Sequence, residues 1–109
     1  MRAGLRALRA SQAPLLVHAE DQTILAESAP NEAEIDPRDY RTFVASRPDA
    51  AESTAVELCV RLAREKRSPV HIVHLSSDQS LPALIQARAE GVPITCEVRG
   101  CLRLCVCVF

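Results

Sequence analysis

Three short runs of apolar residues, at 14–19, 70–75 and 92–97, constrain this chain more than any other feature. Each run has the length and the content of Val, Ile and Leu that is typical of a strand buried on both faces. Stretches with helical patterning separate the runs. Such alternation is typical of a parallel sheet with right-handed crossovers. We therefore predict an α/β fold with about three parallel strands and flanking helices.

The longest predicted helix covers residues 49–67. An apolar stripe at helical spacing supports it and comprises Val56, Cys59, Val60, Leu62 and Ala63. Asp49 and Glu52 at its start resemble a capping box, and three basic residues occupy its last turn. The acidic and basic side chains of this helix, Glu52 among them, are expected on a solvated face.

Further helices are predicted on either side of the apolar runs. Residues 2–12 carry an apolar stripe with Leu5 and Leu8. Ser76 or Ser77 is expected to cap a helix that stops at Gly91. Between the first two strands, a short helix is expected over 21–28, and residues 39–46 are expected to be helical or irregular; a Pro-containing loop separates the two.

Composition excludes several functional classes. The chain of 109 residues has 13 Lys and Arg against 14 Asp and Glu, a balance that argues against a nucleic-acid partner. No apolar run reaches the roughly 20 residues that a membrane span needs. Hydrophobic residues make up 48% of the sequence, which is ordinary for a globular protein rather than a disordered one.

Cysteine usage indicates a reducing compartment. The count of five is odd, and four cysteines fall within the last fourteen residues instead of being spread across the chain. We therefore expect a cytoplasmic or organellar protein that is not secreted. The Arg-containing N-terminus also has features of a transit peptide, although a helix of the folded domain is the preferred interpretation. Residues 98–109 form a distinct Cys-rich tail, in which Cys101, Cys105 and Cys107 do not have a standard zinc spacing.

Two of the three histidines, His18 and His74, come at the carboxyl ends of predicted strands. In parallel α/β folds this edge of the sheet is where sites are built, so we predict a half metal site from the two imidazoles. Strict alternation along the strand would place His74 on the face of Val70 and Ile72, with His71 on the other face. The alternative is that each histidine is a hydrogen-bonded structural residue.

Four segments of the sequence resemble those of the allantoinases of the cyclic amidohydrolase superfamily. They are Pro-Leu-Leu-Val-His-Ala-Glu at 14–20, Ser-Arg-Pro at 46–48, His-Ile-Val-His-Leu-Ser-Ser at 71–77 and Ile-Thr-Cys-Glu at 94–97. The resemblance covers about residues 3–97. It is also compatible with the related dihydropyrimidinases and dihydroorotases.

The resemblance implies a (β/α)8 barrel that opens a cyclic amide ring, hydrolysing allantoin to allantoate in purine breakdown. It implies a centre of two metal ions, usually zinc, and often a homotetramer. His18 corresponds to the metal ligand on the fifth strand and His74 to the one on the sixth, both on the same ion, whereas His71 corresponds to no ligand. Residues 1–97 would then be a partial barrel domain, about strands 5–7.

Other parts of the family pattern are absent from this chain. It contains no His-x-His, and its only lysine, Lys66, lies at a helix end, where it cannot be the bridging ligand that the family carboxylates. No segment supplies the aspartate of the eighth strand, so no catalytic residue is assigned. We expect a truncated, inactive form of the enzyme that self-associates. The alternative from another class is a non-catalytic protein that docks on full-length subunits.

Overall fold

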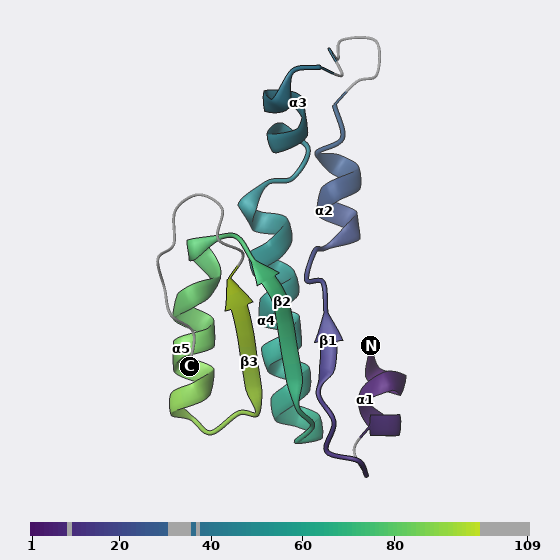
Figure 1. Ribbon diagram of the computed structural model, residues 1–109, viewed down its shortest axis with the longest axis vertical. Helices are drawn as coiled ribbons and strands as arrows, with labels where there is room; N and C mark the ends of the chain where they lie inside the picture. Colours follow the sequence, from purple (N-terminus) through teal and green to yellow (C-terminus); the bar gives the residue numbers. More distant parts are fainter. Residues whose placement is uncertain (9, 31–35, 37, 99–109) are drawn as a thin grey trace.

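The computed structural model describes residues 1–8, 10–30, 36 and 38–98. The elements follow one another as predicted, with helices between the strands (Figure 1). They are α1 (Arg2–Leu8), β1 (Leu15–Val17), α2 (Gln22–Glu27), α3 (Tyr40–Ala45), α4 (Asp49–Lys66), β2 (Val70–Leu75), the 3₁₀ turn η2 (Asp78–Ser80), α5 (Leu81–Ala89) and β3 (Ile94–Val98).

The three strands form one parallel sheet in the order β1-β2-β3, which confirms the predicted architecture. Leu15 pairs with Val70, and Val70 pairs in turn with Ile94. All three arrows in Figure 1 point toward the end of the sheet from which α2 and α3 project. β3 also takes in Val98, which pairs with Leu75, so the strand runs one residue into the segment predicted as tail.

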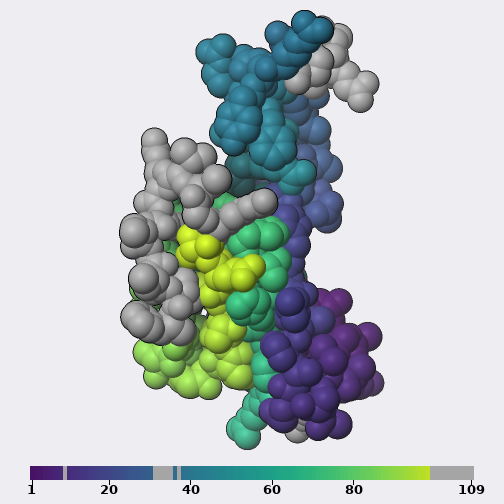
Figure 2. Space-filling view, in the orientation of Figure 1, coloured from purple at the N-terminus to yellow at the C-terminus, as the bar shows by residue number. Residues whose placement is uncertain are grey.

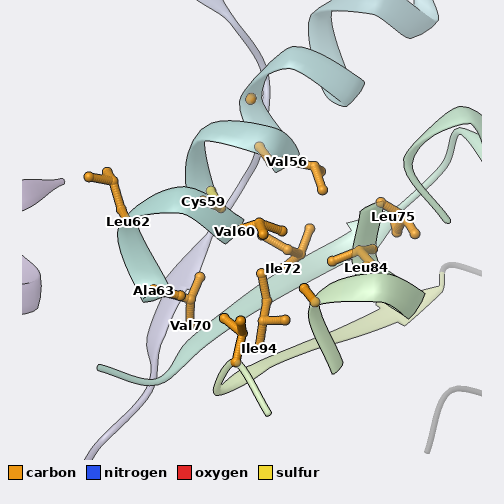
Figure 3. Close-up of a cluster of buried hydrophobic side chains, with 14 of the residues drawn as sticks. Val56, Cys59, Val60, Leu62, Ala63, Val70, Ile72, Leu75, Leu84 and Ile94 are labelled. Carbon is orange, nitrogen blue, oxygen red and sulfur yellow. The ribbon is translucent and has the colours of Figure 1, made fainter. Parts of the chain in front are cut away.

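The hydrophobic core lies between one face of the sheet and the helices α4 and α5 (Figure 3). Its side chains include Val56, Leu62, Ile72 and Ile94, each 2% exposed or less. The expectation that the strands are buried on both faces is wrong. Leu16, whose side chain points to the opposite face, is 65% exposed.

The N-terminal helix is shorter than predicted, because α1 ends at Leu8 and Gln12 has a φ of +55°. Leu5 is nevertheless completely buried, and its carbonyl oxygen accepts a hydrogen bond from the Ser68 hydroxyl at 3.3 Å. This segment is therefore a packed helix of the domain.

The start of α4 differs from the predicted capping box. Pro48 is the N-cap residue and offers no side-chain hydrogen bond, and Asp49 is already helical. The Glu52 carboxylate is not on a solvated face. It accepts hydrogen bonds from backbone N–H groups that lie beyond the end of β2. At the other end, Arg67 takes the left-handed conformation and ends the helix.

The short helices α2 and α3 extend the molecule beyond the carboxyl end of the sheet (Figure 2). The Asp21 side chain caps α2 by accepting from the N–H groups of Thr23 and Ile24, and Asp39 caps α3 by accepting from the N–H of Arg41. The short helix predicted over 21–28 is confirmed, and the segment expected to be helical or irregular forms α3. None of the described helices is long and apolar enough to cross a membrane.

Candidate metal site

The two predicted histidines meet at the carboxyl end of neighbouring strands. His18 directly follows β1, and His74 is the second-last residue of β2. Nδ1 of His18 lies 3.0 Å from Nε2 of His74, and the ring centroids are 4.7 Å apart. Two residues far apart in the sequence thus form one pair because their strands are hydrogen-bonded neighbours.

An irregularity in β2 turns the His74 side chain toward His18. The register with β3 shifts between Ile72 and Leu75, and His74 has a φ of +45°. As a result Leu75 instead of His74 follows Val70 and Ile72 into the core. The prediction from strict alternation, which placed His74 on the face of Val70 and Ile72, is wrong because an irregularity of this kind shifts the side-chain alternation of a strand.

Glu20 is the nearest carboxylate to the pair. Its Oε2 atom lies 2.6 Å from Nε2 of His18 and 2.5 Å from Nη1 of Arg47. Burial acts to raise the pKa of Glu20, but the hydrogen bonds and charges of Arg47 and His18 outweigh it, so the pKa of this carboxyl is lowered. The carboxylate is therefore ionised at neutral pH and accepts both hydrogen bonds.

This contact determines which nitrogen of His18 is available. An ionised carboxylate only accepts, so Nε2 of His18 carries the hydrogen. In the neutral imidazole Nδ1 is then an acceptor, and it faces Nε2 of His74, which donates the hydrogen between the two rings when no metal is bound. The sequence does not mark Glu20 or Arg47 as site residues. A carboxylate two residues after a strand-end histidine could have identified Glu20, whereas no local signal identifies Arg47.

Glu52 fixes the backbone that follows His74. Its carboxylate accepts from the N–H of Ser76 at 2.9 Å and from the N–H of Ser77 at 2.5 Å. The Ser77 hydroxyl in turn accepts from the N–H of Gln79 and caps the 3₁₀ turn η2. The helix predicted to be capped here, α5, begins only at Leu81, with Ser80 as its N-cap residue. One helix side chain thus holds the loop at the carboxyl end of β2.

His71 lies outside the pair. Its Nδ1 is 2.8 Å from the hydroxyl of Thr95 on β3, and its Nε2 is 3.9 Å from a carboxylate oxygen of Glu97. These contacts join two strands across the uncovered face of the sheet. His71 is thus engaged by Thr95 and Glu97 of β3.

The geometry of the two histidines fits two ligands of one metal ion. Imidazole nitrogens that each lie about 2.0–2.1 Å from a tetrahedral zinc ion are about 3.3 Å apart, close to the 3.0 Å between Nδ1 of His18 and Nε2 of His74. In the described part of the chain, no group of three or more His, Cys, Asp or Glu residues could hold a metal ion. The described residues therefore offer this pair of histidines and no third candidate ligand grouped with it. Cys101, Cys105 and Cys107 lie outside the described residues.

A separate hollow of about 470 Å³ lies beside α3 and includes neither histidine. Seven residues line it: Pro30, Arg38, Asp39, Tyr40, Thr42, Phe43 and Ser46. Tyr40 and Phe43 stack there with centroids 5.8 Å apart. No residue of this hollow is in the predicted site, so the histidine pair remains the candidate for chemistry.

Comparison with known proteins places this arrangement in a class. No protein-family model matches the chain. The allantoinase of Streptomyces avermitilis is 46% identical over 83 residues, which is 76% of this chain and 18% of that protein. The dihydroorotase of Pelobacter propionicus is 33% identical over 97 residues, covering 89% of this chain and 22% of that protein. A D-hydantoinase structure superposes with a TM-score of 0.78 at 23% identity, over 89% of this chain and 21% of that one.

The sheet and its helices are therefore part of a (β/α)8 barrel of the cyclic amidohydrolase class. Within this class the sequence is that of an allantoinase-like segment, since allantoinases from a yeast and a frog also match it at 36% and 41% identity. The resemblance read from the sequence is confirmed. The chain spans about a fifth of the length of the curated relatives it matches.

Proposed function

We propose that His18 and His74 supply two ligands to one zinc ion of an allantoinase-type centre. The single observation that carries this proposal is the 3.0 Å separation of His18 Nδ1 and His74 Nε2 at the carboxyl ends of adjacent parallel strands. This is the edge at which (β/α)8 enzymes build their active sites. The segment would then correspond to about strands 5–7 of the complete barrel.

The reaction proposed for the complete enzyme is hydrolysis of allantoin to allantoate. The names of the matching relatives support this substrate class. A zinc ion in such a centre polarises the amide carbonyl and lowers the pKa of bound water. In this chain, His18 and His74 would hold the ion, and Glu20 would keep the His18 ring oriented. The chain alone is expected to be inactive, because three protein ligands are usual in a catalytic zinc site.

Zinc titration followed by NMR of the histidine rings tests the proposal. We expect weak binding that shifts the ring signals of His18 and His74 and leaves those of His71 unchanged. His18→Ala and His74→Ala should each abolish the response, whereas His71→Ala, the matched control, should preserve it. A zinc response centred on His71, or none at the pair, would contradict the assignment.

An allantoin assay of the same preparation tests the expected inactivity. We expect no zinc-dependent turnover above a buffer blank, because the described residues group two histidines and no third candidate ligand, whereas three protein ligands are usual in a catalytic zinc site. Turnover that is lost in His74→Ala would show that further ligands exist in this chain.

A second candidate is a sibling activity on a dihydroorotate or dihydropyrimidine ring, which the match to a dihydroorotase favours. The two candidates differ in the ring that the complete enzyme opens, so parallel assays with allantoin and dihydroorotate on a complete barrel containing this segment separate them. The non-catalytic alternative is docking on full-length subunits. Co-purification with a defined full-length amidohydrolase would support that alternative.

A further inference from the structure

Glu20 and Arg47 form a connected pair behind His18. Glu20 is in the loop after β1, and Arg47 is in the turn between α3 and α4. One carboxylate oxygen, Oε2, contacts both His18 Nε2 and Arg47 Nη1, at 2.6 and 2.5 Å. The Glu20 side chain is only 16% exposed, against 54% for that of His18. The more buried Glu20 carboxylate therefore restrains the more exposed His18 ring.

The hydrogen bond between His18 and Glu20 determines which ring nitrogen of His18 can bind a metal ion. A histidine ligand commonly donates its other ring N–H to a carboxylate, which fixes the orientation of the ring and the nitrogen left for the metal. Here Nε2 is engaged by Glu20, and Nδ1 is left facing His74. Removing the carboxylate removes the hydrogen bond at Nε2 that restrains the 54% exposed His18 ring against rotation about its Cβ–Cγ bond.

Arg47 keeps the carboxylate in place. Its guanidinium also lies over the ring of Phe43 on α3, with Cζ 5.3 Å from the ring centroid. The long excursion between β1 and α4 thus returns a cation to the carboxyl end of β1. This gives the Ser-Arg-Pro segment a physical role that the sequence did not reveal.

We propose that Glu20, held by Arg47, is a positioning residue that presents Nδ1 of His18 to the metal ion. This inference rests on the proposed metal site. It predicts which ring nitrogen binds the ion and which residues outside the ligand set determine that choice. Neither Glu20 nor Arg47 is itself assigned as a ligand.

The experiment is ¹⁵N NMR of the histidine rings in the full chain, first without metal and then with added zinc. Without metal, we expect a hydrogen-bonded Nε2–H signal from His18 and a nuclear Overhauser contact between the His18 and His74 rings. With zinc, Nδ1 of His18 should be the nitrogen that shifts. In Glu20→Ala the Nε2–H signal and the contact between the rings should weaken, zinc should bind through either nitrogen, and the zinc affinity should fall about 10–100-fold.

Three variants complete the test. Glu20→Gln keeps an oxygen acceptor for Nε2–H, so ligation through Nδ1 should be retained with a smaller loss of affinity. Arg47→Met should weaken zinc binding less than Glu20→Ala does, because the Glu20 carboxylate remains and only becomes more mobile. Glu57→Ala removes an exposed carboxylate from α4 and should change nothing.

The outcomes distinguish the proposed metal site from the proposed positioning role of Glu20. If zinc shifts neither ring in the unaltered chain, the proposed metal site fails, while the metal-free spectra still decide whether Glu20 orients His18. If Glu20→Ala keeps the Nε2–H signal, the contact between the rings and exclusive Nδ1 ligation with unchanged affinity, the inference is wrong. If Glu20→Ala does not fold, the Glu20→Gln and Arg47→Met variants test the positioning role of Glu20 instead. Nδ1 ligation lost in Glu20→Gln, or unaltered affinity in Arg47→Met, would overturn it.

Discussion

At the scale of single residues, polar contacts of half-buried carboxylates hold the loops around the two histidines. Glu52 is the clearest case, because its carboxylate accepts the backbone N–H groups of Ser76 and Ser77 and so replaces water there. Leaving such donors without a partner costs about 1–3 kcal/mol when they are shielded from solvent. The side chain that the sequence predicts to be solvated is therefore a stabilising contact between α4 and the loop after β2.

Glu52→Ala should lower the free energy of unfolding by about 1–3 kcal/mol, because both N–H groups lose their acceptor. Urea denaturation followed by circular dichroism measures this change. The matched control is Glu57→Ala on the exposed side of the same helix, which should stay within about 0.5 kcal/mol. Equal effects of the two substitutions would contradict the role given to Glu52.

Cys59, in contrast to Glu52, makes no polar contribution and packs as an apolar side chain of the core. It is 0% exposed in the core beside α4's other apolar side chains, and burial raises the pKa of its thiol to about 11. Since the thiolate is the reactive form, a buried thiol with a raised pKa is inert.

We expect Cys59 to resist iodoacetamide at neutral pH in the folded chain and to react fully in denaturant, as peptide mass mapping would show. The folded state keeps the thiol proton more tightly than the unfolded chain. Stability from this group is thus complete below the ordinary thiol pKa of 9 and is lost as pH rises from there toward about 11. Labelling of Cys59 at the rate of the denatured chain would rule out the packed core.

At the scale of elements, α4 contributes more buried residues than any other described element and also ends in a strained backbone position. It has 18 residues, seven of them buried. It ends at Arg67, whose φ of +47° and ψ of +44° are left-handed. A residue with a Cβ is strained in this region by about 1–2 kcal/mol, whereas glycine is not. Glycine would also cost more chain entropy on folding, which offsets part of that gain.

Arg67→Gly should therefore raise the free energy of unfolding by about 0.5–1 kcal/mol, because relief of the left-handed strain exceeds the entropy cost. Thermal denaturation detects this as a higher midpoint. Arg61→Gly, an exposed interior position of the same helix, should lower stability by about 1 kcal/mol. A loss of stability in both variants would show that the Arg67 side chain contributes more than its backbone costs.

At the scale of the whole molecule, the described helices cover one face of the sheet and leave the other face open to the part of the chain that the structure does not describe or to solvent. Leu16 lies on the other face, and β1 and β3 are edge strands within the described residues. Unpaired strand edges favour association between chains. The sequence of 99–109, outside the described residues, adds an apolar stretch that contains no Pro and no acid, a composition that favours aggregation.

We expect the intact chain to self-associate in solution, as analytical ultracentrifugation would show. Removing residues 99–109 should raise the monomer fraction without creating activity, because the ligand set is unchanged. Leu16→Lys should raise it further by placing a charge on the uncovered face. A monodisperse, cooperatively melting monomer of the intact chain would contradict this expectation.

The sequence by itself determined the order of elements, the parallel sheet and the histidines at its carboxyl edge, because apolar periodicity and chain order are local signals. Only the tertiary structure decided which face of the sheet is buried, since that depends on where α4 and α5 pack. It also decided the side to which His74 points, because an irregularity in β2 shifts the alternation. The contacts of Glu20 with Arg47 and of Glu52 with the loop after β2 join residues distant in the chain, and no local pattern contains them.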